Sequence, residues 1–377
     1  MKRLAGAALA AAVTAGLLTA PAHAASAPTR VFHVETEGAV TKQAKMQSVL
    51  NYWTEGQLKR IDEAMYFDHT VADTNDPELQ HNLIPAAEMT QGGPWDDKGE
   101  PWPEGQGQVS QTVGKLFVKM KRPNGTTYNS TCSANIVTSG NKSTVMTAGH
   151  CLRLNVPGAE NATAENAIFI PAFKGDVLRQ GDPTSPKSVA DIAPHGIWVV
   201  TQAFITWGWN FSPNWVIGHD VGSLVVQRPG DTQLIEDAVG ATAITFTRPQ
   251  NAYVHVFGYP SSNQRNWYAP ALNKVSPSEQ RTYDGRRLFH AEGQGTTGSL
   301  YVDTKVPAAL SPGTSGGPLF YQFSNGTGVQ MGVASRFDDP ANPFIGGWSL
   351  GPNLVGNHLG DEERLTYEAA AAVTITQ

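Results

Sequence analysis

Short runs of β-favouring residues separated by turn signals dominate the sequence from Val113 onward, and they limit the folds open to this chain. The first run, 113–120, leads into Arg122-Pro-Asn-Gly125, a strong turn signal that contains proline and glycine. The further predicted strands are 133–138, 144–147, 167–170, 197–205, 221–226, 243–247, 253–257, 299–303 and 329–334. Many short strands with little helical periodicity predict an all-β sandwich or barrel.

Helical spacing is confined to two stretches near the ends of the chain. In 42–66, apolar residues recur every three or four positions, namely Met46, Val49, Leu50, Trp53, Leu58, Ile61 and Met65. Residues 361–372 predict a C-terminal helix. Residues 91–107 are packed with glycine and proline, which predicts a linker between the N-terminal segment and the β-rich part.

Residues 1–24 have the three parts of a secretory signal peptide. Lys2 and Arg3 give a positive start, 4–20 are apolar and rich in alanine, and Pro21-Ala-His-Ala24 offers a cleavage site. No second apolar run follows that would hold the chain in a bilayer. We therefore expect a secreted, extracellular protein.

The two cysteines, Cys132 and Cys151, fit an exported protein. Export favours a disulfide between them, with two free thiols as the alternative. Two cysteines without a Cys/His quartet do not make a structural zinc site.

Charge and histidine spacing exclude several classes of function. The net charge is −6, and 40% of the residues are hydrophobic, enough for a substantial core. Basic residues form no run after Lys2 and Arg3, which argues against nucleic acid or a membrane surface as a partner. None of the ten histidines forms a His-x-x-x-His or His-Glu-x-x-His pair, so we expect no metal ion and no cofactor.

Two motifs carry the residues that nucleophilic catalysis by serine requires. Thr147-Ala-Gly-His-Cys151 places His150 after a strand and two small residues, so that its ring can lean over the strand end. In Gly313-Thr-Ser-Gly-Gly-Pro318, glycine on both sides of Ser315 allows a sharp loop in which the N–H groups of Gly313 and Ser315 point the same way. Such a serine needs a base and an oxyanion hole, which predicts Ser315 as nucleophile, His150 as base and those two N–H groups as donors.

Together the two motifs resemble the trypsin/chymotrypsin superfamily. The similarity is greater to bacterial secreted members, the V8-like glutamyl endopeptidases and actinobacterial trypsin-like serine peptidases. It runs over roughly 113–367, with the segments Phe169-Ile-Pro-Ala172 and Phe257-Gly-Tyr-Pro260, and a further similar segment, Tyr52-Trp-Thr54, lies in the expected pro-region.

The resemblance implies a fold and an activity. The fold would be two six-stranded antiparallel β-barrels, at about 108–230 and 240–358, in a serine peptidase domain of 108–377. The activity would be hydrolysis of peptide bonds through an acyl-enzyme on Ser315. We expect a monomer that acts on a protein or peptide substrate, with 25–107 as a pro-region and linker or else a plain N-terminal extension.

The third catalytic residue must be an acid between His150 and Ser315. Asp191 and Asp220 stand in similar local settings, but Pro194 ends any strand after Asp191. Asp220 opens the apolar run 221–226 and follows a tryptophan-rich region that precedes the acid in the family. We therefore predict Asp220, and we interpret His219 as a bystander because adjacent strand residues point to opposite faces.

The chain departs from trypsin-type relatives before the nucleophile and in the specificity pocket. Thr314 stands where their zymogens have an aspartate that pairs with a newly freed N-terminus, so we expect pro-region removal to unblock the cleft instead. The resemblance places the pocket at 306–310 and 333–337, with Ala309, Leu310, Ala334, Ser335 and Arg336 as candidate contacts. The small residues favour a small or apolar substrate side chain, or are simply barrel core, whereas Arg336 would favour an acidic one.

Two rival readings remain. Gly313-Thr-Ser-Gly-Gly317 also matches the nucleophile elbow of an α/β-hydrolase esterase, with Asp339 and His358 as partners, but too few residues follow Ser315 for that fold. A catalytically silent, protease-like binding module is the other alternative, and the presence of all three candidate catalytic residues gives it no support.

Overall fold

The computed structural model describes residues 27–34, 40–65, 99–154, 161–175, 188–211, 218–260, 285–297, 303–308, 310, 313–338 and 353–376. The predicted signal peptide, the first part of the predicted linker and most of the predicted strand at 299–303 lie outside the described residues.

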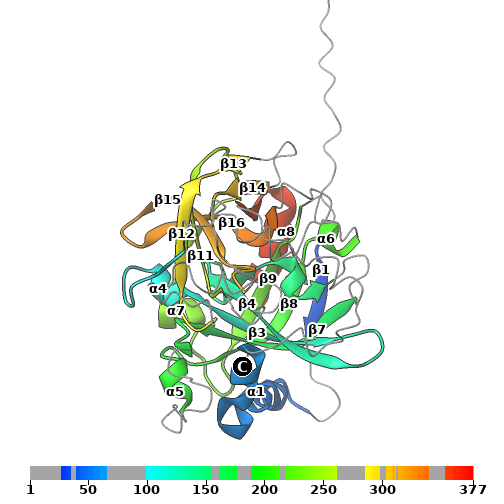
Figure 1. Ribbon diagram of the computed structural model, residues 1–377. Helices are drawn as coiled ribbons and strands as arrows, with labels where there is room; N and C mark the ends of the chain where they lie inside the picture. The colour runs from blue at the N-terminus through cyan, green and yellow to red at the C-terminus, as the bar shows by residue number, and fades with distance from the viewer. Residues whose placement is uncertain are drawn as a thin grey trace, which may run out of the picture.

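The first half of the β-rich region forms a closed barrel (Figure 1). Its strands are β3 (Val113–Lys121), β4 (Thr127–Ile136), β5 (Thr144–Thr147), β7 (Ala162–Pro171), β8 (Trp198–Ile205) and β9 (Gly222–Gln227). The antiparallel order is β3, β4, β5, β9, β8, β7, and the ring closes because β7 pairs with both β8 and β3. Closure leaves no free edge among these six strands.

The second half forms a sheet that curls into a half-barrel. Its main strands are β11 (Tyr253–Gly258), β12 (Phe289–Gln294), β14 (Asp303–Val306), β15 (Pro318–Ser324), β16 (Thr327–Asp338) and β17 (Asn353–His358). Short strands extend it, namely β2 (Glu100–Pro101), β10 (Ala243–Ile244) and β13 (Thr296–Thr297). The predicted all-β, chymotrypsin-like fold class is confirmed.

Each sheet encloses its own apolar core, and two further clusters contain residues of both sheets. Alternating inward residues fill the first barrel around Leu116, Phe169 and Trp198, which are fully buried. Val137 and Met146 of the first barrel pack with Val333 of β16 in one of these two clusters. The seam between the sheets is therefore fixed by packing, and loops from both halves meet along it.

The N-terminal segment adds a strand and a helix to the first barrel. β1 (Thr29–His33) pairs antiparallel with β8, and α1 (Lys42–Met65) covers the outside of the barrel beneath β3 (Figure 1). Trp53 of α1 is fully buried, and its indole N–H donates to Asn166 Oδ1 at 3.1 Å. The predicted helix at 42–66 thus forms an integral part of the apolar packing around the barrel.

The other helices are short, apart from the one that ends the chain. They are α4 (Val109–Thr112), α5 (Val189–Ile192), α6 (Trp207–Phe211) and α7 (Ile235–Val239). α8 (Asp361–Ala371) is the predicted C-terminal helix, one residue shorter than expected. Among the described residues, no helix has the length and apolar character needed to cross a membrane.

Three of the main strands of the second sheet, β12, β15 and β17, were not predicted from the sequence. In β12 the inward positions include Ala291 and Gly293, too small to register as an apolar alternation. β15 follows directly on a Gly-Gly-Pro run, and β17 holds two asparagines and Gly356. Their strand state is set by neighbours in the sheet rather than by local preference.

Candidate active site

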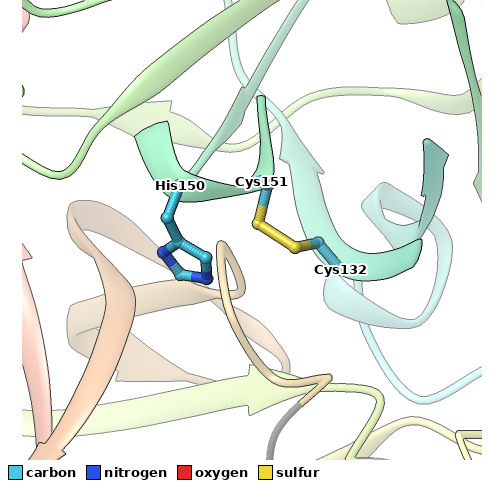
Figure 2. A group of neighbouring side chains, drawn as sticks. All are labelled: Cys132, His150 and Cys151. Atoms are coloured by element: carbon cyan, nitrogen blue, oxygen red, sulfur yellow. A yellow bond between two sulfur atoms is a disulfide. The ribbon is translucent and has the colours of Figure 1, made fainter. Parts of the chain in front are cut away.

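The turn after β5 positions His150 at the seam. A 3-10 turn, Gly149–Cys151, follows β5, and a disulfide joins Cys151 to Cys132 on β4 with a Cα–Cα distance of 6.2 Å (Figure 2). A side chain at Gly149 would collide with the indole of Trp209, so only glycine fits there. The predicted disulfide is therefore present, and it fixes the turn that carries His150.

Asp220 is a buried carboxylate that receives several hydrogen bonds. It is 1% exposed and accepts bonds from the backbone N–H of His150 (2.7 Å) and the Oγ of Ser335 (2.6 Å). Its Oδ2 also lies 2.7 Å from Nδ1 of His150. Because an ionised carboxylate only accepts, Nδ1 carries the hydrogen, and the other ring nitrogen, Nε2, keeps its lone pair. These donors offset the cost of burying the charge.

The glycine-rich loop before β15 docks on the same part of the first barrel. The Ser315 carbonyl accepts the N–H of Ser133 at 2.7 Å, and the Gly313 carbonyl accepts the Ser133 hydroxyl at 2.8 Å. Gly313 and Gly316 have φ values of 99° and 79°, a region that favours glycine. A side chain at Gly316 would collide with Thr147 and the Ser133 carbonyl, which lie close to the His150 turn. Ser315 itself is partly exposed.

The structure separates the two candidate acids. Asp220 contacts His150, whereas Asp191 is exposed on α5, on a helix whose N-cap is Ser188. Of the residues in the esterase reading, His358 is buried in β17 and Asp339 lies outside the described residues.

The candidate pocket residues take different positions. Leu310 and Ala334 are buried, and Ala309 lies outside the described residues. Ser335 donates to Asp220, so its hydroxyl faces the acid. Arg336 pairs with Asp303 of β14 at 2.9 Å, and the two side chains are 11% and 12% exposed. Its charge is therefore largely neutralised by a neighbour within the sheet.

Three polar residues of the site were not assigned these contacts by the sequence. Ser133 holds the glycine-rich loop that carries Ser315, Ser335 supports Asp220, and Asn357 accepts the Asp220 backbone N–H at 3.1 Å. The last two come from β16 and β17 of the second sheet. Buried serine and asparagine in strands carry no local motif, so only the assembled seam identifies them.

His219, beside Asp220, makes a separate contact with the C-terminal helix. Its φ is 63°, and its Nδ1 lies 2.6 Å from Glu363 Oε1, which also pairs with Arg248 through Oε2 at 3.0 Å. Burial lowers the pKa of His219, but the hydrogen bond and charge of Glu363 outweigh it and raise the pKa above its ordinary value. That His219 takes no part in catalysis stays a prediction. Its contact with Glu363 helps to hold α8 against the rest of the protein.

Solved structures provide the comparison with known proteins. The protease Anisep from Arthrobacter nicotinovorans is 26% identical with a TM-score of 0.52, covering 71% of this chain and 99% of its own. The thermostable serine protease AL20 from an extremophilic microorganism shares the fold at 24% identity and a TM-score of 0.50, covering 71% and 100%. No protein-family model and no curated protein sequence matches the chain.

The likeness to Anisep spans nearly the whole of that protease. The similarity to bacterial serine proteases agrees with the resemblance that the motifs around His150 and Ser315 indicate. The chain therefore has a chymotrypsin-like fold and is similar to bacterial serine proteases such as Anisep.

Proposed function

We propose that this chain is a secreted serine endopeptidase with Ser315 as nucleophile, His150 as general base and acid, and Asp220 as the residue that orients His150. The observation that carries the proposal is the 2.7 Å contact between His150 Nδ1 and the buried Asp220 carboxylate. That contact fixes one tautomer of the imidazole and leaves Nε2 as the basic atom.

The proposed reaction is acyl transfer in two stages. His150 Nε2 takes the proton of the Ser315 hydroxyl as its oxygen attacks the substrate carbonyl, and the proton then passes to the leaving amine. Water, activated by the same nitrogen, releases the acyl group. Asp220 stabilises the imidazolium at each stage, and the N–H groups of Gly313 and Ser315 bind the oxyanion.

The proposed specificity is for a small or apolar side chain before the cut. Leu310 and Ala334 are buried apolar residues, and so is Ala308, two positions before Leu310 in the sequence. The pairing of Arg336 with Asp303 removes the reason to expect a preference for acidic residues. A cleavage profile dominated by Glu or Asp would contradict this part of the proposal.

The proposed site of action is extracellular, after removal of the signal peptide. The disulfide between Cys132 and Cys151 supports an oxidising compartment. Thr314 is buried and packs its side chain toward Gly258, so no acid stands there to bind a new N-terminus. We propose that pro-region removal unblocks the cleft; a fully active enzyme whose N-terminus remains near Ala25 would exclude this.

The experiment that tests the function compares the secreted protein with two serine variants. Ser315→Ala should lose cleavage of a peptide library by about 10⁴-fold or more and should no longer react with a fluorophosphonate. Ser110→Ala, at a hydroxyl that bonds to the Gln106 carbonyl, should keep both properties. Fluorophosphonate labelling of the Ser315→Ala variant would overturn the assignment, and absence of labelling in all three proteins would favour the silent binding module.

A further inference from the structure

Two histidines and a glutamate gather on the outer face of the β11–β12 pair. In the antiparallel register His255 lies opposite Glu292, and Phe257 lies opposite His290. Because side chains alternate along a strand, His255, His290 and Glu292 share one face of this pair.

The donor atoms of the three side chains lie close together. His255 Nδ1 lies 2.8 Å from Glu292 Oε2 and 3.0 Å from His290 Nε2, and the third separation, between His290 Nε2 and Glu292 Oε2, is 3.8 Å. A tetrahedral zinc ion with bonds of about 2.0–2.1 Å needs neighbouring donors about 3.3 Å apart. The three separations bracket that value, so small side-chain rotations suffice to form a three-ligand site.

Hydrogen bonds within this cluster cannot satisfy all of its polar atoms. A ring nitrogen carries either one hydrogen or one lone pair, so His255 Nδ1 makes one well-directed bond although two polar atoms face it. A cation among the three atoms accepts a lone pair from each.

The surrounding aromatic residues hold the two imidazoles in place. His255 packs against Phe323 with ring centroids 4.5 Å apart, and His290 stacks on Phe257 at 4.6 Å. Tyr253 also lies edge-on to His255, with ring centroids 5.4 Å apart. Preorganised rings are what supporting residues supply around metal ligands.

The site is open to solvent on one side. The two histidine side chains are each 15% exposed and that of Glu292 is 46% exposed. Ions can therefore enter, and water can fill the coordination positions that the protein leaves open.

We propose that His255, His290 and Glu292 bind a divalent transition-metal ion, with Zn²⁺ as the occupant, and that the ion stabilises the β11–β12 edge of the second sheet. Two imidazoles with one carboxylate select zinc over calcium or magnesium, which take oxygen ligands. The ion would join two strands at the edge where β12 pairs with β2. The expectation of no metal came from helical spacing motifs, which do not detect ligands on separate strands of a sheet.

The test is zinc titration of the chelator-treated full chain by calorimetry, with thermal unfolding as a second readout. One ion per chain should bind and raise the Tm. Glu292→Gln should weaken binding at least tenfold, and because this side chain is partly exposed the variant should fold normally. His290→Gln should abolish binding and the Tm shift.

His150→Gln is the matched control, because zinc can also bind at that histidine. This variant should keep the ion bound by the β11–β12 site. Zinc binding lost in His150→Gln but unchanged in Glu292→Gln and His290→Gln would overturn the proposal, and so would the absence of stoichiometric binding. The readouts are independent of peptidase activity, so they stand whether or not the proposed function holds.

Discussion

Among single residues, Asp220 combines burial with hydrogen bonds that fix the His150 ring. Asp220→Asn should lower kcat/KM by about 10⁴-fold, because an amide in that position stabilises the wrong imidazole tautomer. Asp191→Asn, on the exposed α5, is the matched control and should leave kcat/KM within about twofold of the original value. Kinetics with one peptide substrate decide the matter, and the reverse pattern would make Asp191 the catalytic acid.

Ser335 offers a second test at this scale, because the sequence assigned it to the pocket and its hydroxyl contacts Asp220. A hydrogen bond to a charged group contributes about 1.5–3 kcal/mol. Ser335→Ala should therefore lower kcat by about tenfold to a hundredfold with little change in KM. Ser335→Thr restores a hydroxyl and should recover much of kcat. An effect confined to KM would instead support the pocket role.

Among the structural elements, α8 is docked by charges whose protonation depends on pH. Burial lowers the pKa of His219, but Glu363 and Glu362 outweigh it and raise the pKa above its ordinary value of 6.5. Burial raises the pKa of Glu363, but His219 and Arg248 outweigh it and lower the pKa below its ordinary value of 4.5. The His219 contribution is complete below pH 6.5 and is lost as pH rises through its raised pKa. The Glu363 contribution is complete above pH 4.5 and is lost as pH falls through its lowered pKa.

The α8 contact should therefore stabilise the protein most between about pH 4.5 and 6.5. His219→Gln should reduce the Tm at pH 5.5, and the difference from the original protein should shrink at pH 8.5. His33→Gln, at a histidine beside Arg30 on β1, provides the control. A Tm difference for His219→Gln that is the same at both pH values would contradict the charge-based account.

On the scale of the whole molecule, the disulfide joins the turn that carries His150 to the interior of β4. The bonded cysteines are 19 residues apart, and closing a loop of that size contributes about 3 kcal/mol to the free energy of unfolding. The double variant Cys132→Ser, Cys151→Ser should lose about that amount in denaturant titration. A loss below about 1 kcal/mol would mean that packing alone holds the turn.

The N-terminal helix α1 packs against the first barrel through Trp53. Trp53 is fully buried against the first barrel, so Trp53→Ala should lower the free energy of unfolding of the full chain by about 3–5 kcal/mol. Gln47→Ala, on the exposed face of α1, should change it little. Equal effects of the two substitutions would show that the helix does not pack as described.

The sequence alone was enough to predict the all-β fold, the terminal helices and the motifs around His150 and Ser315. These features are local: alternating strands, helical spacing, and glycines where the backbone makes a sharp turn or where another chain segment approaches closely. Gly149 and Gly316 are of this kind, since a side chain at either position would collide with its neighbours.

Only the tertiary structure decided which acid meets His150 and which polar residues surround it. Asp220 and Asp191 have similar local sequences, and the choice depends on which strand end reaches the seam. Ser335, Asn357 and the cluster of His255, His290 and Glu292 come from strands whose neighbours are distant in sequence. Cross-strand proximity depends on sheet order and register, neither of which local residue preferences determine.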